Sequence, residues 1–332
     1  MGVHDEGSGE DRLIARFFRP MVHHPGALGL IDDVAVLTPP AGCDLVLTAD
    51  AIIGGVHFFP DDSADVVARK ALRVNLSDLA AKGAKPAGFL LSLAIPQSTG
   101  ENWLAAFARG LGEDAEKYGC PLLGGDTDRT PGPITVSIAA VGTLPTGSMI
   151  TRSGAKVGDR IFVTGTIGDA ALGLKLRRAP AEAWRLTAAM RSHLTERYLM
   201  PQPRNAVAEA IRRHASATID VSDGLAGDFG KLCRASQVSA EIEVARVPLS
   251  EAAHAALAAE PALIEPILTG GDDYEIVGTV PADKLASLSA AARAVGVPLT
   301  EIGRVVAGDA APRFLDADGQ GLKLTRVSFS HF

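Results

Sequence analysis

The stretch ADVVARKALRVNLSDLAAKG (residues 64–83), followed by FLLSLAI (residues 89–95), decides the fold class of this chain. In the first segment Val67, Ala71 and Asp78 recur at helical spacing, which predicts a helix with one apolar face over 64–83. The second segment is short, apolar and rich in large aliphatic side chains, which favours a buried strand. A helix followed closely by a buried strand is typical of a mixed α/β fold.

The same alternation of apolar strands and amphipathic helices continues outward in both directions. Expected strands lie at 31–37, 45–48, 134–141 and 160–164, and expected helices lie at 12–18, at 103–118 and from Ala170 onward. A Gly- and Pro-rich stretch at 145–158 has few large apolar side chains, which is typical of a domain boundary. We therefore expect two α/β domains, over 1–148 and 149–332, and a single larger barrel is the alternative.

Composition and charge narrow the classes of function. The chain has 332 residues, 47% of them hydrophobic and 21% charged, as in ordinary globular proteins. Its net charge of −7 offers no broad basic field, so we expect no nucleic-acid partner. No apolar run is long enough to span a membrane, and the first residues carry no secretory pattern, so we expect a cytoplasmic protein without membrane contact. The three cysteines are widely spaced and are expected to be reduced thiols rather than a zinc site.

Aspartates recur at the ends of apolar strands or beside glycines. They are Asp32, Asp33, Asp50, Asp126, Asp220, Asp223, Asp272 and Asp273. Turn chemistry alone explains any single one, because turns after strands favour Asp and Gly. Together they favour a cluster of carboxylates, which repel one another unless a hard, oxygen-preferring cation such as Mg²⁺ neutralises them. Because Mg²⁺ bridges phosphate oxygens, the pattern predicts a phosphate-bearing substrate such as ATP.

Asp78 adds to this pattern because it continues the apolar face of a predicted helix. A charged side chain in that position is rarely buried without a partner, although a frayed helix end is the alternative. Asn75 lies one turn earlier on nearly the same face. The two side chains are therefore expected to present oxygen ligands or hydrogen bonds to one site.

Two glycine turns, Gly124-Gly125 and Gly165–Gly168, supply a second ingredient. Glycine lets backbone amides approach phosphate oxygens closely, and the second turn directly precedes a predicted helix N-terminus. Tight turning alone is an equally good explanation of these glycines. The sequence contains no P-loop, no GxGxxG after a strand and no protein-kinase HRD or DFG set, so ATP would be held by a different architecture.

In order and with matching spacing, these motifs resemble the thiamine-monophosphate kinase family over nearly the whole chain. The matching stretches are 9–14 (GEDRLI), 32–33 (DD), 50 (D), 55–58 (GVHF), 75–84 (NLSDLAAKGA), 124–127 (GGDT), 152–155 (RSGA), 163–171 (VTGTIGDAA), 220–225 (DVSDGL) and 270–275 (GGDDYE). The resemblance implies the two-domain α/β architecture of the aminoimidazole ribonucleotide synthetase-like (PurM-like) superfamily. It also implies a homodimer formed through the N-terminal domain, with nucleotide and several Mg²⁺ ions between the domains and across the dimer.

The implied activity is ATP-dependent phosphorylation of thiamine monophosphate to thiamine diphosphate, the last step of thiamine diphosphate biosynthesis. By resemblance, the magnesium ligands are Asp33, Asp50, Asp78, Asp126 and Asp220, with Thr48 and Ala49 adjoining them and Asp223 serving a further metal. Asp78, Asp126, Asp220 and Arg152 are the implied catalytic residues, and Gly125, Asp126, Arg152 and Ser222 the implied ATP contacts. His57, Asp272 and Phe329 resemble positions that hold thiamine monophosphate, and for His57 a half-buried structural imidazole is the alternative.

The chain departs from the family pattern at three positions. Ile31 stands where glycine usually precedes the Asp pair, and Ala49 stands where a hydroxyl residue usually precedes Asp50. We expect one weakened metal position as a result, because a backbone carbonyl or water can replace a hydroxyl ligand of Mg²⁺. Asp128 replaces a more usual residue and has no assigned role.

Two other functions were weighed against the kinase. One is a superfamily relative that uses ATP to activate a carbonyl or selenide, but the chain lacks an N-terminal reactive Cys with a neighbouring Lys and a C-terminal Cys. The other is a silent nucleotide-binding module. Retention of the full aspartate set argues against that module, because clustered carboxylates without metal would cost stability.

Overall fold

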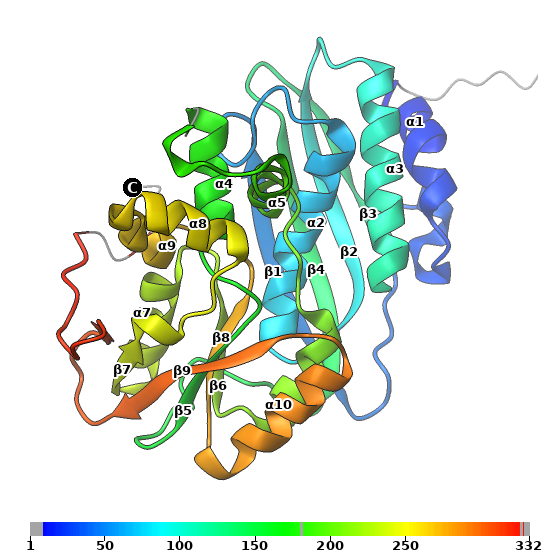
Figure 1. Cartoon of the computed structure of the whole chain (residues 1–332). Coiled ribbons are helices and arrows are strands. Elements are labelled where there is room, and N and C mark those ends of the chain that lie inside the picture. Colours follow the sequence, from blue (N-terminus) through cyan, green and yellow to red (C-terminus); the bar gives the residue numbers. More distant parts are fainter. Residues whose placement is uncertain (1–8, 180–181, 326–327, 329–332) are drawn as a thin grey trace, which may run out of the picture. The chain divides into compact units, whose positions relative to one another are not determined.

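Two β-sheets form the core of the computed structural model, which describes residues 9–179, 182–325 and 328 (Figure 1). The chain divides into two units. The first comprises the described residues up to Leu76 together with Pro86–Thr146, and the second comprises Ser77–Lys85 and the described residues from Gly147 onward. None of the described helices is both long and apolar enough to cross a membrane.

In the first unit the sheet has the strand order β1-β4-β2-β3. The strands are β1 (Cys43–Ile53), β2 (Lys85–Pro96), β3 (Leu122–Thr130) and β4 (Thr135–Pro145). β1 runs antiparallel to β4, and β2 runs parallel to β3. The predicted strand at 45–48 is longer at both ends, so Asp50 lies inside β1 rather than at its end.

Two long helices accompany this sheet, α2 (Ala64–Ala81) and α3 (Glu101–Tyr118). Both predicted helices are confirmed, and α2 and α3 approach closely because Gly110 has no side chain to collide with Asp65. The buried carboxylate of Asp114 on α3 receives hydrogen bonds from Arg69 and Arg73 of α2, at 2.9 and 2.5 Å respectively. Buried charges need such pairing, so this contact fixes how the two helices pack.

The chain before the first sheet is less regular than expected. The predicted helix at 12–18 corresponds to α1 (Gly9–Leu13) and a π-helical turn, η1 (Ile14–Phe18), and 3₁₀ turns follow at η2 (Arg19–Met21) and η3 (Pro25–Leu30). The predicted strand at 31–37 is wrong. Its apolar residues Ile31, Val34 and Val36 are exposed, and no strand among the described residues pairs with this segment. Alternating apolar residues form a strand only where a neighbouring strand accepts their backbone hydrogen bonds.

In the second unit the sheet has the strand order β10-β7-β9-β5-β8-β6. Its strands are β5 (Arg160–Thr164), β6 (Ala217–Asp220), β7 (Ser239–Glu243), β8 (Ile276–Val280), β9 (Leu299–Val306) and β10 (Arg313–Leu315). The helices are α4 (Asp169–Arg178), α5 (Ala188–Leu199), α6 (Ala208–His214), α7 (Leu225–Ser236), α8 (Glu251–Ala259), α9 (Ile264–Thr269) and α10 (Leu285–Ala294), with short 3₁₀ turns at η4 (Glu182–Trp184), η5 (Asn205–Val207), η6 (Val244–Arg246), η7 (Pro261–Leu263) and η8 (Ala282–Lys284).

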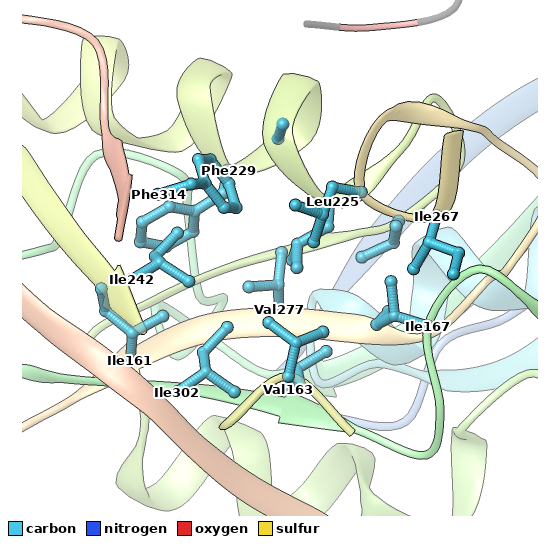
Figure 2. Close-up of a cluster of buried hydrophobic side chains, with 14 of the residues drawn as sticks. Ile161, Val163, Ile167, Leu225, Phe229, Ile242, Ile267, Val277, Ile302 and Phe314 are labelled. Carbon is cyan, nitrogen blue, oxygen red and sulfur yellow. The ribbon is translucent and has the colours of Figure 1, made fainter. Parts of the chain in front are cut away.

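Helices cover both faces of this second sheet. Ile161 and Val163 of β5 point into a large apolar cluster beneath α7, together with Phe229 (Figure 2). Phe162, the residue between them, packs in a separate cluster with side chains of α6, α10 and the last turn of α2. This alternation follows from the two-residue period of a strand, and it buries β5 on both sides.

Candidate functional site

The end of α2 and the end of β6 bring two of the predicted aspartates together in the second unit. Asp220 is the last residue of β6 and is buried, and the hydroxyl of Ser77 on α2 donates a 3.0 Å hydrogen bond to its Oδ2. Burial raises the pKa of Asp220 well above its ordinary value, and the negative charge of Asp78 raises it further. Two carboxylates therefore share a poorly solvated place where a positive charge is favoured.

Lys82 lies beside this pair, four residues after Asp78. Its ammonium donates a 2.6 Å hydrogen bond to the carbonyl oxygen of Thr218 on β6. Burial, together with the nearby charge of Arg152, lowers the pKa of Lys82 to about 8, although Asp220 and Asp78 act in the opposite direction. The structure thus gathers Asp78, Asp220 and Arg152 around a lysine that was given no role from the sequence.

The loop after β6 carries Ser222 and Asp223, and a buried aspartate of α7 holds it in place. Oδ2 of Asp228 accepts hydrogen bonds from the backbone N–H groups of Ser222 and Asp223, at 3.0 and 2.8 Å. The ammonium of Lys231 bridges Asp223 Oδ2 and Asp228 Oδ1, at 2.6 and 2.8 Å. Burial raises the pKa of Asp228. Asp223 therefore has a cationic protein partner, which sequence reasoning missed.

Asp272 lies in a strained turn that is bonded to the same loop. Its backbone N–H donates to Ser222 O at 2.9 Å, and the N–H of Tyr274 donates to Val221 O at 2.8 Å. Asp272 and Tyr274 have φ values of +72° and +50°. Residues other than glycine are disfavoured in this left-handed region by about 1–2 kcal/mol each, so the surrounding contacts must stabilise the turn.

The Gly165–Gly168 turn was expected to offer amides to phosphate, and this prediction is wrong for three of its amides and for the amide of Ala170 in the first turn of α4. Gly168 N and Ala170 N donate to the carboxylate of Asp273, at 2.7 and 3.2 Å. Gly165 N and Ile167 N donate to the carbonyl oxygens of Pro298 and Pro248. An internal carboxylate thus occupies the helix N-terminus that a phosphate would need, and tight turning explains the glycines.

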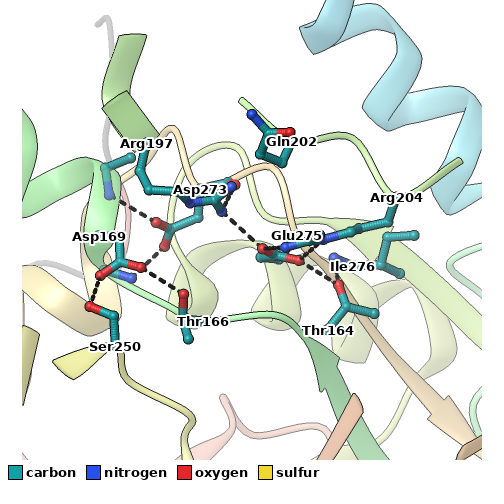
Figure 3. Close-up of polar contacts among 12 residues, drawn as sticks. Thr164, Thr166, Asp169, Arg197, Gln202, Arg204, Ser250, Asp273, Glu275 and Ile276 are labelled. Atoms are coloured by element: carbon teal, nitrogen blue, oxygen red, sulfur yellow. Dashed lines mark hydrogen bonds and ion pairs between the residues drawn. The ribbon is translucent and has the colours of Figure 1, made fainter. Parts of the chain in front are cut away.

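Two further buried acids complete this network (Figure 3). Asp169 accepts hydrogen bonds from the hydroxyls of Thr166 and Ser250, at 2.6 and 2.5 Å, and contacts His193 Nε2 at 3.1 Å. Glu275 receives hydrogen bonds from Thr164, Arg197 and Arg204. These acids are paired with protein groups on several sides, so they hold the turn rather than offer ligands.

In the first unit, Asn75 ties α2 to β1. Its Oδ1 accepts a 3.0 Å hydrogen bond from the backbone N–H of Asp50, and its Nδ2 donates to Ala71 O. Both of these partners of Asn75 are backbone groups. Its expected joint role with Asp78 at one site stays a prediction. The carboxylate of Asp33 lies on an exposed segment, and Thr48 and Ala49 lie within β1.

Gly125 and Asp126 lie inside β3 rather than in a turn after it. Asp126 is exposed and pairs in register with Ser92 of β2. A Cβ on Gly125 would overlap the carbonyl oxygen of Leu91, so strand packing alone requires glycine at this position. His57 is half-buried and its Nδ1 accepts a 3.0 Å hydrogen bond from Ile53 N, which matches the structural alternative given for this imidazole. Phe329 lies outside the described residues.

Known proteins resemble the chain in both sequence and fold. Models of the AIR synthase related protein family match residues 31–144 (N-terminal domain) and 156–313 (C-terminal domain). A thiamine-monophosphate kinase from Caulobacter vibrioides is 42% identical over 322 residues, which cover 96% of this chain and 89% of that protein. The chain belongs to the thiamine-monophosphate kinase family.

Solved structures of the family agree with this assignment. The crystal structure of thiamine-monophosphate kinase from Stenotrophomonas maltophilia K279a matches with a TM-score of 0.80 and 37% identity, covering 94% of this chain and 96% of that chain. The structure of AaThiL complexed with AMPPCP and TMP matches with a TM-score of 0.76 and 30% identity, covering 91% of each chain. The two-domain PurM-like fold expected from the sequence is thereby confirmed.

Sequence reasoning missed several residues that the structure places around the candidate site. They are Lys82, Asp228, Lys231 and Glu275, together with Asp273 as the acceptor of backbone hydrogen bonds at the start of α4. Lys82 follows Asp78 by four residues, so the helical period itself could have indicated a neighbour. Asp228 and Lys231 are three residues apart on α7, so the same period could have indicated their contact, but the bonds from Asp228 to the backbone of Ser222 and Asp223 depend on the path of the loop before α7. Taken unit by unit, the described residues contain no group of three His, Cys, Asp or Glu side chains that could hold a metal ion by themselves.

Proposed function

We propose that this chain transfers the γ-phosphoryl group of ATP to thiamine monophosphate, giving thiamine diphosphate and ADP, the last step of thiamine diphosphate biosynthesis. The observation that carries this proposal is 42% identity to a thiamine-monophosphate kinase over 96% of the chain. The related structure of AaThiL with AMPPCP and TMP supports a nucleotide and a phosphate acceptor as the two substrates.

The acceptor needs no strong general base. A phosphate monoester has a second pKa of about 6 and is largely dianionic near neutral pH, so one of its oxygens is already nucleophilic. The obstacle is repulsion between two polyanions. Positive charge and fixed orientation should therefore supply most of the acceleration, and Arg152 is proposed to screen the reacting phosphates and contact ATP.

Magnesium fits the acid pair of the second unit. Asp220 is buried beside a second negative charge from Asp78, and its raised pKa shows that a cation or a proton is favoured there. Carboxylate oxygens are the ligands that Mg²⁺ prefers, and phosphate oxygens and water commonly complete its coordination. Bound Mg²⁺ would neutralise phosphate charge and help align the reacting groups.

We assign the proposed site residues as follows. Mg²⁺ ligation is assigned to Asp33, Asp50, Asp78, Asp126, Asp220 and Asp223, with Thr48 and Ala49 adjoining; Gly125 and Ser222 are assigned to ATP, and His57, Asp272 and Phe329 to thiamine monophosphate. Because the ammonium of Lys231 already contacts Asp223, a metal ion would either bind beside that ammonium or displace it from the carboxylate. Asp272 suits the cationic thiazolium of the substrate.

A homodimer is proposed through the sheet of the first unit. Leu45 and Leu47 of β1 and Leu90 of β2 are exposed, with Leu47 72% exposed. Exposed apolar side chains grouped on a sheet are typical of a protein–protein contact. We place the enzyme in the cytoplasm, where Cys43, Cys120 and Cys233 would remain free thiols, as they are in the structure.

The proposed reaction is tested by ADP release with thiamine monophosphate and, separately, with thiamine, which lacks the phosphate nucleophile. Release should require ATP, Mg²⁺ and thiamine monophosphate together. Asp78→Asn and Asp126→Asn should each lower kcat by about 100-fold or more, because each removes a carboxylate proposed to hold the Mg²⁺ that would neutralise the reacting phosphates. Asp283→Asn, an exposed change elsewhere, is the control. Near-normal turnover of either site variant would overturn its assignment.

A further inference from the structure

The turn that carries Asp272 has a conformation that needs active support. Asp272 and Tyr274 both have left-handed φ values, +72° and +50°, although neither is glycine. Such conformations persist when surrounding contacts over-determine them, and they are concentrated at functional sites. Asp273, the residue between them, is fully buried and supplies much of that support.

The side chain of Asp273 bonds the turn to the start of α4 (Figure 3). Its Oδ2 accepts from Gly168 N at 2.7 Å and its Oδ1 accepts from Ala170 N at 3.2 Å. Its carbonyl oxygen accepts a 3.0 Å hydrogen bond from Nη2 of Arg197, which also donates to Glu275. Both oxygens of this side chain thus accept hydrogen bonds from the protein, and Asp273 is fully buried.

Tyr274 acts on Asp272 from the other side. Its hydroxyl donates to Oδ1 of Asp272 at 3.4 Å, and its backbone N–H is held by Val221 O at 2.8 Å. The carboxylate of Asp272 is therefore oriented by a neighbour whose own position depends on the anchored turn. Orientation of a charged group within a fraction of an ångström matters for binding, so such supporting residues influence affinity without touching the ligand.

We propose that Asp273, together with Tyr274, is a positioning residue that fixes the carboxylate of Asp272 where the cationic thiazolium of thiamine monophosphate binds. This inference rests on the proposed function, and specifically on Asp272 as a substrate residue. It assigns to Asp273 an effect on the substrate that passes through Asp272. Nucleotide binding should be little affected, because Asp272 is not assigned to ATP.

The test is a double-mutant cycle on KM for thiamine monophosphate. Asp273→Asn keeps the side-chain volume but places an amide N–H₂ against one of the two backbone donors, Gly168 N or Ala170 N. It should raise KM for thiamine monophosphate about tenfold and leave KM for ATP within about twofold of its original value. Tyr274→Phe should raise KM for thiamine monophosphate about threefold. In an Asp272→Asn background, either change should add less than about twofold, because residues that act through one another are not additive.

The controls are Asp283→Asn, an exposed carboxylate of η8, and Tyr118→Phe in the first unit, and neither should change KM. An unchanged KM in folded Asp273→Asn, or effects of Asp272→Asn and Asp273→Asn that simply multiply, would overturn the inference. If Asp273→Asn does not fold, Tyr274→Phe decides by the same criteria. If the unaltered enzyme forms no thiamine diphosphate, the proposed function is refuted. If Asp272→Asn leaves KM for thiamine monophosphate unchanged, the inference about Asp273 is refuted but the kinase activity is not.

Discussion

The stability of the second unit should fall as pH rises from 5.5 to 7.5, and Asp273 should cause a large part of the fall. Burial raises the pKa of Asp273 to about 8, against the lowering effect of its hydrogen bond from Gly168. The unfolded chain should have an ordinary Asp pKa of about 3.9. Between these two values the folded state binds more protons, so this group's stabilisation is complete below pH 4 and is lost as pH rises toward 8.

The size of the effect follows from the two pKa values. One proton bound only by the folded state corresponds to about 1.4 kcal/mol per pH unit. Because the folded carboxyl begins to ionise near pH 7.5, the loss between pH 5.5 and 7.5 is about 2.5 kcal/mol. Asp273→Asn removes the ionisation altogether, so the variant should lack this part of the pH dependence. Asp220 and Asp228 also have raised pKa values, but both remain in the variant and cancel in the comparison.

Urea unfolding monitored by tryptophan fluorescence provides the assay. Trp184 is buried in the core of the second unit, so a Trp103→Phe background makes the signal report that unit. The free energy of unfolding should fall about 2.5 kcal/mol further in the parent than in its Asp273→Asn derivative between pH 5.5 and 7.5. Equal pH slopes in the two proteins would refute the reasoning.

Three further predictions concern packing and assembly. Arg73→Met leaves the buried carboxylate of Asp114 with one cationic partner fewer, so it should destabilise the first unit by about 3 kcal/mol. Urea unfolding in a Trp184→Phe background, which leaves Trp103 as reporter, measures this loss, and a loss below about 1 kcal/mol would contradict the prediction. Gly125→Ala should give little folded protein, because its Cβ overlaps the carbonyl of Leu91 in the paired strand; normal yield and circular dichroism would show that the strands can separate cheaply. Leu47→Asp should convert a dimer of about twice 34.4 kDa into a monomer, as measured by light scattering. The control is Val157→Asp, which changes an exposed apolar residue of the second unit and should leave the dimer intact. A dimer that survives Leu47→Asp would place the interface elsewhere.

Regular elements with a clear period were predictable from the sequence. The helix at 64–83 and the strand at 160–164 are found as α2 and β5. The apolar residues of α2 recur at helical spacing, and β5 is a short continuous apolar run that is buried on both sides. The segment at 31–37 has similar residues but no neighbouring strand among those described, so it stays irregular. Strand formation depends on a partner that local sequence does not reveal.

The candidate site was predictable in its residue types but not in its pairings. Asp220 was indicated by the recurrence of Asp beside apolar strands, and Asp78 by its place on the apolar face of a predicted helix. The structure places both in one electrostatic environment. The glycine turn at 165–168 had the features of a phosphate-binding turn. The side chain of Asp273, more than a hundred residues later in the chain, instead accepts the hydrogen bond of the Gly168 amide. Such a long-range partner arises from the path of the folded chain rather than from spacing, and the contact of Lys231 with Asp223, eight residues apart, depends likewise on the turn between them.

Phosphorus NMR of the products formed from ATP, Mg²⁺ and thiamine monophosphate, with each omitted in turn, decides whether the chain is a thiamine-monophosphate kinase. Diphosphate signals of thiamine diphosphate should appear in step with ADP, and only when all three are present. Consumption of ATP without thiamine diphosphate, or no turnover by folded protein, would contradict the proposed function.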